Sequence, residues 1–465
     1  MLAITETIGA FLWTPVMLVI LLGFGIVLTF RFKFFQIVHM KRIYEETIAT
    51  LFAKKERREQ RERDKSNKNS ITPFEAVSAA LAGTMGVGNI AGVATAITAG
   101  GAGAVFWMWV SAFFCMIIKY IEVVLAQLYK VPKNGGYIGG PMYYISIGLK
   151  SRKLACAFAL FCVVSSFGIG NMSQVNTISQ SFESTFGFNK TAVGIIVAAI
   201  VALIIIGGVK RIVAFTSRMI PAMSLIYMLA ALVVIIFNAS NISDSIRLIF
   251  TDAFAPQQAG AGILGFLTSR AIRFGISRGI FTHEAGLGSA PIAHAVASPK
   301  SPSEQGMWGI FEVFFDAIVS CTITALAILS TGVYKTAGLD GINLTNEAFA
   351  SVFGTGAGIF LAAAIFSFAM MTLVTWSFYG ESCVAYLFEH NSSGQVLAKN
   401  IYKIVFISLI IVGASVNIGV VWNLSDIFNA FMALPNMIAV VILSPAAYRE
   451  TKEYLHAWRL RKRAE

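Results

Sequence analysis

Eleven stretches of mostly apolar residues, each long enough to form a membrane-spanning helix, dominate the sequence. A helix needs about 20 such residues to cross the hydrocarbon core of a bilayer. The stretches cover residues 11–30, 72–99, 101–129, 154–182, 191–208, 217–237, 243–276, 306–331, 357–388, 400–420 and 424–444. Val193–Gly208 is apolar on every side, whereas a surface helix of a soluble protein needs a polar outer face. The sequence therefore predicts an all-α polytopic membrane protein.

Composition supports this class and argues against others. Apolar residues make up 56% of the chain and charged residues only 13%, whereas soluble domains carry about 25% charged residues. The apolar content excludes intrinsic disorder. There is no phosphate-binding loop, H-E-x-x-H motif or soluble lobe, so we expect neither catalysis nor an enzymatic cofactor. The five cysteines lie in apolar stretches without metal-ligand spacing, and we expect them to be core residues.

The distribution of Lys and Arg predicts the orientation, because these residues concentrate in cytoplasmic loops. With the N-terminus outside, 32 of the 36 Lys and Arg fall in inner segments, chiefly a basic loop over 31–70 and a tail over 445–465. The net charge of +12 is then an orientation signal and a contact with lipid headgroups, and no nucleic-acid partner is expected. This topology predicts a cell-membrane protein with a cytoplasmic C-terminus. It places Arg270, Arg273 and Arg278 toward the cytoplasm.

Glycines interrupt two of the predicted spans. The second span contains four glycines within Gly83–Gly92, together with Thr84 and Asn89. Non-helical backbone at membrane depth is tolerated only where it is buried in protein or lines a wet cavity, so we predict an unwound hinge there. In the seventh span we prefer a break at Pro256–Gly265, which includes Gly262. Later glycines, at and beyond the end of that span, offer an alternative break: Gly275, Gly279, Gly286 and Gly288.

The positions of the two breaks predict an inverted repeat. If residues 1–30 form an extra first helix, ten spans remain, and the broken ones are each the first of five. Because five is odd, the halves 71–241 and 242–444 have opposite orientations. Glycine-interrupted helices at corresponding places in inverted halves are typical of secondary transporters with a binding site at the membrane midplane.

Broken helices favour a zwitterionic substrate and a cation. The free N–H groups of a half-helix suit a carboxylate, whereas unwound carbonyls suit Na⁺ or an ammonium group. Among the polar residues within the spans, we favour Gln174 for substrate contact. For Asn171 and Asn176, hydrogen bonds that join two helices are as good an explanation as substrate contact. In the ninth span Thr372, Thr375 and Trp376 could line a small pocket, although helix back-bonding and packing explain them as well.

Ionisable residues within the spans are interpreted mainly as structural. Lys119 and Glu122 are three residues apart on one helix, and we expect them to pair with each other. Glu312 and Asp316 could meet Arg273 or Arg278 in an inner gate, and Asp316 could alternatively contact a cation or relay protons. His283 and Glu284 are predicted on the cytoplasmic side and form no metal motif.

Three long motifs resemble the alanine or glycine:cation symporter family. They are Gly100–Ser111 (GGAGAVFWMWVS), Gly88–Ala94 (GNIAGVA) and Arg278–Pro291 (RGIFTHEAGLGSAP). The chain departs from the family pattern at a few places, where other residues are common: Cys115, Thr282-His283, Met371 and Thr375. The resemblance extends over nearly the whole chain.

The resemblance implies the leucine-transporter fold with an extra first helix, sodium-coupled uptake and a small neutral amino acid as substrate. The expected substrate residues, from the pattern and the resemblance together, are Thr84, Gly86, Gly88, Gln174, Gly262, Thr372 and Trp376. The expected sodium residues are Met85, Asn89 and Thr372. Glutamine as substrate, H⁺ as coupling ion and a passive channel are the alternatives, although the few intramembrane polar residues argue against a channel.

Overall fold

The computed structural model describes residues 13, 17–52, 71–133, 135–254, 270–336, 338–339, 341–416 and 418–464. The α-helices are α2 (Leu18–Arg31), α3 (Phe35–Val38), α4 (Met40–Glu46), α6 (Pro73–Thr84), α7 (Ala91–Gly100), α8 (Gly103–Leu128), α9 (Pro141–Tyr143), α10 (Arg152–Phe167), α11 (Ser173–Phe186), α12 (Lys190–Ile205), α13 (Gly208–Phe237), α14 (Ile242–Ala253), α17 (Arg270–His283), α18 (Ala290–Ala295), α19 (Pro302–Val313), α20 (Cys321–Thr331), α21 (Gly341–Phe353), α22 (Gly356–Leu387), α23 (Ser392–Gly413) and α24 (Ile418–Ala464). A small antiparallel pair, β1 (Val131–Lys133) and β2 (Gly136–Ile138), follows α8.

Seven helical stretches in the described part of the chain are long and apolar enough to cross a membrane. They coincide with seven of the spans expected from the sequence and are Gly103–Leu128, Arg152–Phe186, Gly208–Phe237, Pro302–Thr331, Gly356–Leu387, Ser392–Gly413 and Leu424–Lys462. Two of them contain π turns, η5 (Gly168–Met172) between α10 and α11 and η7 (Phe314–Ser320) between α19 and α20. Such turns widen a helix and are frequent at functional sites.

The region of the second predicted span consists of two short helices, α6 and α7, separated by residues 85–90. Thr72 and Glu75 form a capping box at the start of α6, and Pro73 occupies its first turn, a strong helix-start signal. The helix ends where Met85 leaves the helical region. The next helical residues after Gly86 form only a short 3₁₀ turn, η3 (Val87–Asn89).

The preferred break in the seventh predicted span is not tested by the structure. Pro256–Gly265, including Gly262, lies outside the described residues. A described interruption separates α17 from α18 at residues 284–289 and contains two of the alternative glycines, Gly286 and Gly288. Glu284, Gly286 and Gly288 have positive φ values of 50°, 89° and 84°, which stop a right-handed helix.

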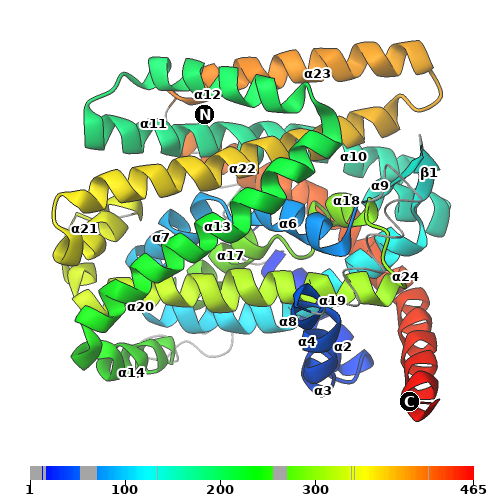
Figure 1. The fold of residues 1–465 in the computed structure, drawn as a ribbon, viewed down its shortest axis with the longest axis horizontal. Coiled ribbons are helices and arrows are strands. Elements are labelled where there is room, and N and C mark those ends of the chain that lie inside the picture. The colour runs from blue at the N-terminus through cyan, green and yellow to red at the C-terminus, as the bar shows by residue number, and fades with distance from the viewer. Residues whose placement is uncertain are drawn as a thin grey trace.

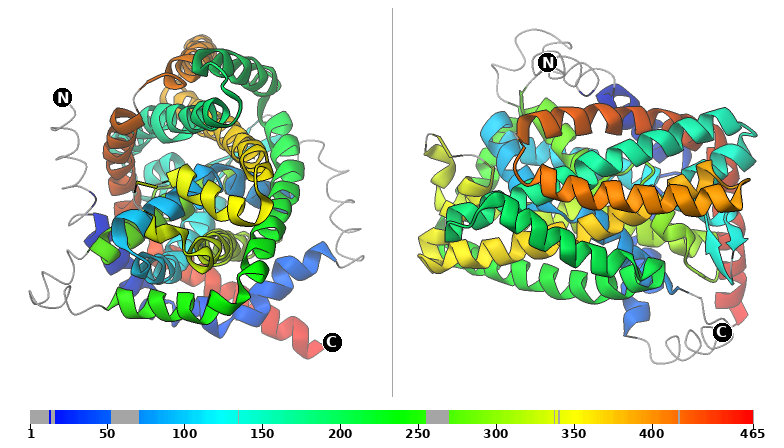
Figure 2. Two further views of the ribbon diagram at one scale, coloured as in Figure 1. Left: turned by 90° about the vertical axis from the view of Figure 1, so that its left-hand side faces the viewer. Right: turned by 90° about the horizontal axis from the view of Figure 1, so that it is seen from above.

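The two interrupted segments lie antiparallel in the middle of the molecule. The helix α6 contacts α18, and α7 contacts α17, although α6 precedes α7 and α17 precedes α18 along the chain. In Figure 1 all four lie between an upper group with α11, α12, α22 and α23 and a lower group with α8 and α19. Figure 2 shows α12 and α23 at one edge and the end of α24 projecting at another. Two breaks are thus enclosed side by side.

Contacts of α17 correct the predicted position of its arginines. The Nε of Arg270 donates to the carbonyl of Ala99, at the end of α7, at 2.8 Å, and Arg278 lines a cavity together with Lys190. The predicted topology assigns residues 100 and 190 to the outside. If that topology is kept, α17 begins near the outer side of the membrane. The prediction that Arg270 and Arg278 lie toward the cytoplasm is therefore wrong.

Candidate functional site

Three elements converge on the first break at Gly86. A Cβ atom on Gly86 would lie 2.7 Å from Oγ1 of Thr372 and 3.1 Å from Oε1 of Gln174. The same Oε1 lies 3.5 Å from the backbone nitrogen of Val87. The side chains of Thr372 and Gln174 are buried. The structure therefore brings together three of the residues expected from the sequence, Gly86, Gln174 and Thr372, around unwound backbone.

Hydrogen bonds restrain Thr372 and Gln174, the two polar side chains beside the first break. The hydroxyl of Thr372 lies 3.0 Å from the carbonyl of Ala82, in the last turn of α6, where helix carbonyls lack partners within the helix. It also lies 3.2 Å from the Phe368 carbonyl of its own helix, so its one hydrogen is shared between the two acceptors. The amide nitrogen of Gln174 donates to the carbonyl of Ile169, within the π turn η5, at 3.0 Å. These bonds leave Gln174 Oε1 facing the break.

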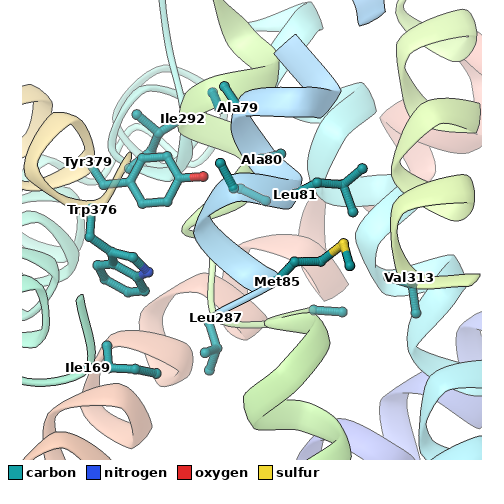
Figure 3. Close-up of a cluster of buried hydrophobic side chains, with 14 of the residues drawn as sticks. Ala79, Ala80, Leu81, Met85, Ile169, Leu287, Ile292, Val313, Trp376 and Tyr379 are labelled. Carbon is teal, nitrogen blue, oxygen red and sulfur yellow. The ribbon is translucent and has the colours of Figure 1, made fainter. Parts of the chain in front are cut away.

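Other predicted residues of the first break have different surroundings. The hydroxyl of Thr84 lies 3.4 Å from the Leu81 carbonyl of its own helix. A Cβ on Gly88 would contact Phe281 of α17 at 3.4 Å, so Gly88 lies where the two broken segments meet. The sulfur of Met85 accepts from Ser224 of α13 at 3.7 Å. Figure 3 shows this side chain extending away from Trp376.

Asn89 belongs to a second polar cluster, away from Thr372. Its amide nitrogen contacts the carboxylate of Asp316 and lies 3.3 Å from both the Asp316 carbonyl and Ser320 Oγ. An amide group has only two N–H donors, so it cannot satisfy all these acceptors. Asn89 Oδ1 and Asp316 Oδ2 are buried without a described hydrogen-bond partner. The three expected sodium residues thus do not form one cluster of side chains.

The second break is held by buried polar groups from other helices. The backbone nitrogen of Gly286 donates to Glu122 of α8 at 3.2 Å, and its carbonyl accepts from Asn436 of α24 at 2.9 Å. Asn436 also donates to Glu122. Because buried backbone groups need partners, these contacts compensate for the missing helical hydrogen bonds. Sequence reasoning missed Asn436, although an amide within an apolar stretch is the same signal that identified Gln174.

Trp376 links the second break to α22. Its indole nitrogen donates to Glu284 Oε1 at 3.2 Å. A side chain on Gly170 would collide with Trp376 Cβ, so the glycine in η5 admits this helix. Figure 3 shows the indole between Tyr379 and Ile169, on the side of α6 opposite Val313. Trp376 follows Thr372 by one helical turn, and both residues are buried.

The buried charges form tertiary pairs that differ from the prediction. Lys119 Nζ pairs with Glu312 Oε1 at 3.2 Å, and His294 of α18 contacts Glu312 Oε2 at 2.9 Å. The predicted pairing of Lys119 with Glu122 is wrong, because Glu122 instead accepts hydrogen bonds from Gly286 and Asn436 at the second break. Glu312 likewise meets Lys119 rather than an inner gate of arginines.

The two asparagines near Gln174 form hydrogen bonds to a neighbouring helical segment. Asn171 donates to the Phe406 carbonyl at 2.7 Å, and Asn176 donates to the Gly413 and Val416 carbonyls at 2.9 and 2.8 Å. They join α11 and its π turn to α23. Of the three amides, Gln174 is the one that faces the break.

A cavity of about 580 Å³ with many polar lining residues lies between α7 and α11. Its lining includes Thr95, Gln180, Glu183, Lys190 and Arg278. Lys190 pairs with Glu183 at 2.8 Å. In the predicted topology this cavity opens on the outer side, next to α7 and α11.

Comparisons with known proteins agree on one family. The model of the sodium:alanine symporter family matches residues 1–465. The sodium/alanine symporter AgcS of Methanococcus maripaludis is 39% identical over 460 residues, which cover 97% of each chain. A probable sodium/glutamine symporter, GlnT of Bacillus subtilis, is 38% identical over 95% of this chain and 88% of its own. The crystal structure of MhsT with L-phenylalanine, a leucine-transporter-fold protein, has a TM-score of 0.58 at 15% identity and covers 80% of this chain and 89% of that one.

Proposed function

Because this chain belongs to the sodium:alanine symporter family, we propose that it carries alanine or glycine into the cell together with Na⁺ by alternating access. Family membership makes it a multi-pass membrane transporter for sodium-coupled amino-acid symport rather than an enzyme. The identity of the amino acid, the residues that bind it and the order of events are our proposals. We also propose the eleven-span topology with five-plus-five inverted repeats and the N-terminus outside.

One observation supports the substrate site most strongly: the convergence of Thr372 and Gln174 on Gly86. The substrate carboxylate would bind N–H groups near Gly86–Gly88 and replace the long contact of Val87 with Gln174. Its ammonium would then meet Gln174 Oε1 or the hydroxyl of Thr84. The absence of a side chain at Gly86 gives the ligand access to the backbone, as glycines do at other anion sites.

Trp376 would form the wall next to the substrate side chain, because it lies one turn from Thr372. Such a wall limits substrate size, which favours alanine and glycine over glutamine. Gly262, in the part of the chain that is not described, remains a predicted contact.

We place sodium binding at the unwound backbone on both sides of Gly86. Thr372 and the Ala82 carbonyl already lie 3.0 Å apart, and Na⁺ prefers such oxygens. Met85 would contribute through its main-chain carbonyl, because its sulfur faces Ser224. Asn89 would act through the cluster with Asp316. Na⁺ would favour the substrate-competent state through its higher affinity for that state, and this difference couples the two solutes.

The test is uptake of labelled alanine, glycine and glutamine by the purified protein in proteoliposomes. We expect concentrative uptake of alanine or glycine that requires an inward Na⁺ gradient. Preference for glutamine would refute the proposed substrate. Uptake that never exceeds equilibration would favour a passive channel.

Asp316 supports H⁺ coupling as a second candidate. Its carboxylate is fully buried, and Oδ2 has no hydrogen-bond partner among the described residues. A buried carboxylate needs a cation or a proton to compensate its charge. If protons drive transport, wild-type uptake follows a pH gradient without Na⁺ and Asp316→Asn loses that response. If Na⁺ drives it, wild-type uptake stays Na⁺-dependent across pH.

A further inference from the structure

We propose that Glu284, in the break between α17 and α18, is a positioning residue that holds Trp376 and thereby sets the largest substrate side chain accepted. This inference rests on the proposed function, because it treats Trp376 as a wall of the substrate pocket. It adds a determinant of substrate size that lies in the second broken segment.

The side chain of Glu284 is divided between two donors. Oε1 accepts from the indole nitrogen of Trp376 at 3.2 Å, and Oε2 accepts from the hydroxyl of Ser289 at 2.5 Å. Both oxygens are therefore occupied by groups of known orientation. Glu284 is only 2% exposed, and Trp376 is fully buried, so water does not compete for these contacts.

The backbone of Glu284 is constrained as well. Its φ of 50° is unusual for a residue with a side chain, and its N–H still donates to the Ile280 carbonyl at 2.8 Å. Non-glycine residues persist in this region only when surrounding contacts require it. The strained backbone directs the carboxylate toward α22, and Ser289 holds it from the beginning of α18.

Among the described residues, the indole nitrogen has one hydrogen bond, to Glu284, and the other contacts of the ring are packing contacts. The ring contacts Tyr379 edge-on, with centroids 5.5 Å apart, and the Cβ and ring of Trp376 pack against the backbone of Gly170. A larger substrate side chain would have to push the ring aside, which requires breaking its hydrogen bond to a carboxylate. Leaving a buried donor and its acceptor without partners costs about 1–3 kcal/mol, so Glu284 penalises large substrates selectively.

The test is the ratio of kcat/KM for alanine to that for glutamine, measured in proteoliposomes with a constant Na⁺ gradient. Glu284→Met keeps a chain of similar length but removes the acceptor, and Trp376→Phe removes the donor. We expect each to lower the ratio about tenfold, and the double variant to lower it no further, because both remove one bond. Glu284→Gln retains an acceptor oxygen and should keep the ratio within about threefold.

Ser289→Ala is the matched control, since it removes the other bond of the same carboxylate and leaves the Trp376 contact. We expect it to retain the wild-type ratio. If Glu284→Met does not reach the membrane, Glu284→Asp replaces it, because a shorter carboxylate cannot contact both donors. An equal loss of activity toward both substrates, or additive effects in the double variant, would overturn the proposal.

A second readout separates this proposal from the proposed function. Stabilisation of the detergent-solubilised protein against heat by alanine or glutamine reports selectivity without transport. Absence of Na⁺-driven uptake in the wild type would refute the symport mechanism alone, provided that amino acids still stabilise the protein. If the variants retain the wild-type order of stabilisation, the role of Glu284 is refuted. If no amino acid stabilises the wild type, both fail.

Discussion

Replacing Gly86 by alanine tests the substrate site directly. The added Cβ would lie 2.7 Å from Thr372 Oγ1 and 3.1 Å from Gln174 Oε1, whereas ordinary van der Waals contacts begin at about 3.4 Å. Neither neighbour can move freely, because Thr372 is bonded to Ala82 and Gln174 to Ile169. Overpacking of a closed site costs about 1–3 kcal/mol. In the proposed binding pose the same Cβ would also occupy space beside the N–H groups that the substrate carboxylate contacts. A cost of this size in the bound state corresponds to about a 5- to 150-fold loss of substrate affinity.

The assay compares Gly86→Ala with Gly92→Ala, six residues later in the same interrupted segment. A Cβ on Gly92 meets nothing within 4 Å, so this control shares the change in unfolded-chain entropy without the collision. We expect Gly86→Ala to raise KM for alanine about 5- to 150-fold and Gly92→Ala to remain near the wild type. Equal KM values for the two variants in sodium-driven uptake would refute the proposed location of the substrate.

Three further experiments test other parts of the structure. Glu312→Gln leaves the buried Lys119 without its carboxylate and should destabilise the protein by about 3–5 kcal/mol. Adding Lys119→Met should recover much of this loss. Unfolding in detergent measures both variants, and a double variant as unstable as Glu312→Gln would contradict the pairing. Asn89→Ala should raise the Na⁺ concentration for half-maximal uptake about tenfold, and an unaltered sodium titration would exclude Asn89 from ion binding. Gly288→Ala places a side chain on a residue with a φ of 84°, and its Cβ would lie 2.8 Å from Phe158. We expect it to lower the free energy of unfolding by about 1–3 kcal/mol. An unfolding midpoint equal to that of the wild type would contradict the backbone conformation of the second break.

The long helices could be predicted from sequence because their signal is local. A continuous apolar run such as that of α8 or α22 needs no knowledge of its neighbours. The first break was also visible, since four glycines with Thr84 and Asn89 rarely form a stable helix. Gln174 was identified because an amide among apolar residues is costly unless it has a role.

The second break was harder because its glycines serve two different purposes. A side chain on Gly275 would collide with the Ala104 carbonyl of α8, and one on Gly279 would collide with Ser111, so these two permit close helix packing. Gly286 and Gly288 instead adopt positive φ. Spacing in the sequence does not distinguish these two roles of glycine, so it does not identify Gly286 and Gly288 as the break.

The partners of the buried charges could not be inferred from spacing either. Lys119 and Glu122 suggest a local pair, yet Lys119 bonds a residue 193 positions away. The choice depends on how α8 packs against α19 and on the demand of the Gly286 N–H for an acceptor. Tertiary contacts of this kind follow from the fold and have no local signal.

Coupled flux is the measurement that tests the central claim most directly: sodium and the amino acid are bound together at the first break. Alanine added outside proteoliposomes should stimulate entry of labelled Na⁺ by the wild-type protein, and Thr372→Ala should reduce this stimulation at least about tenfold. Alanine uptake without any stimulated Na⁺ entry, or full stimulation in Thr372→Ala, would contradict the account.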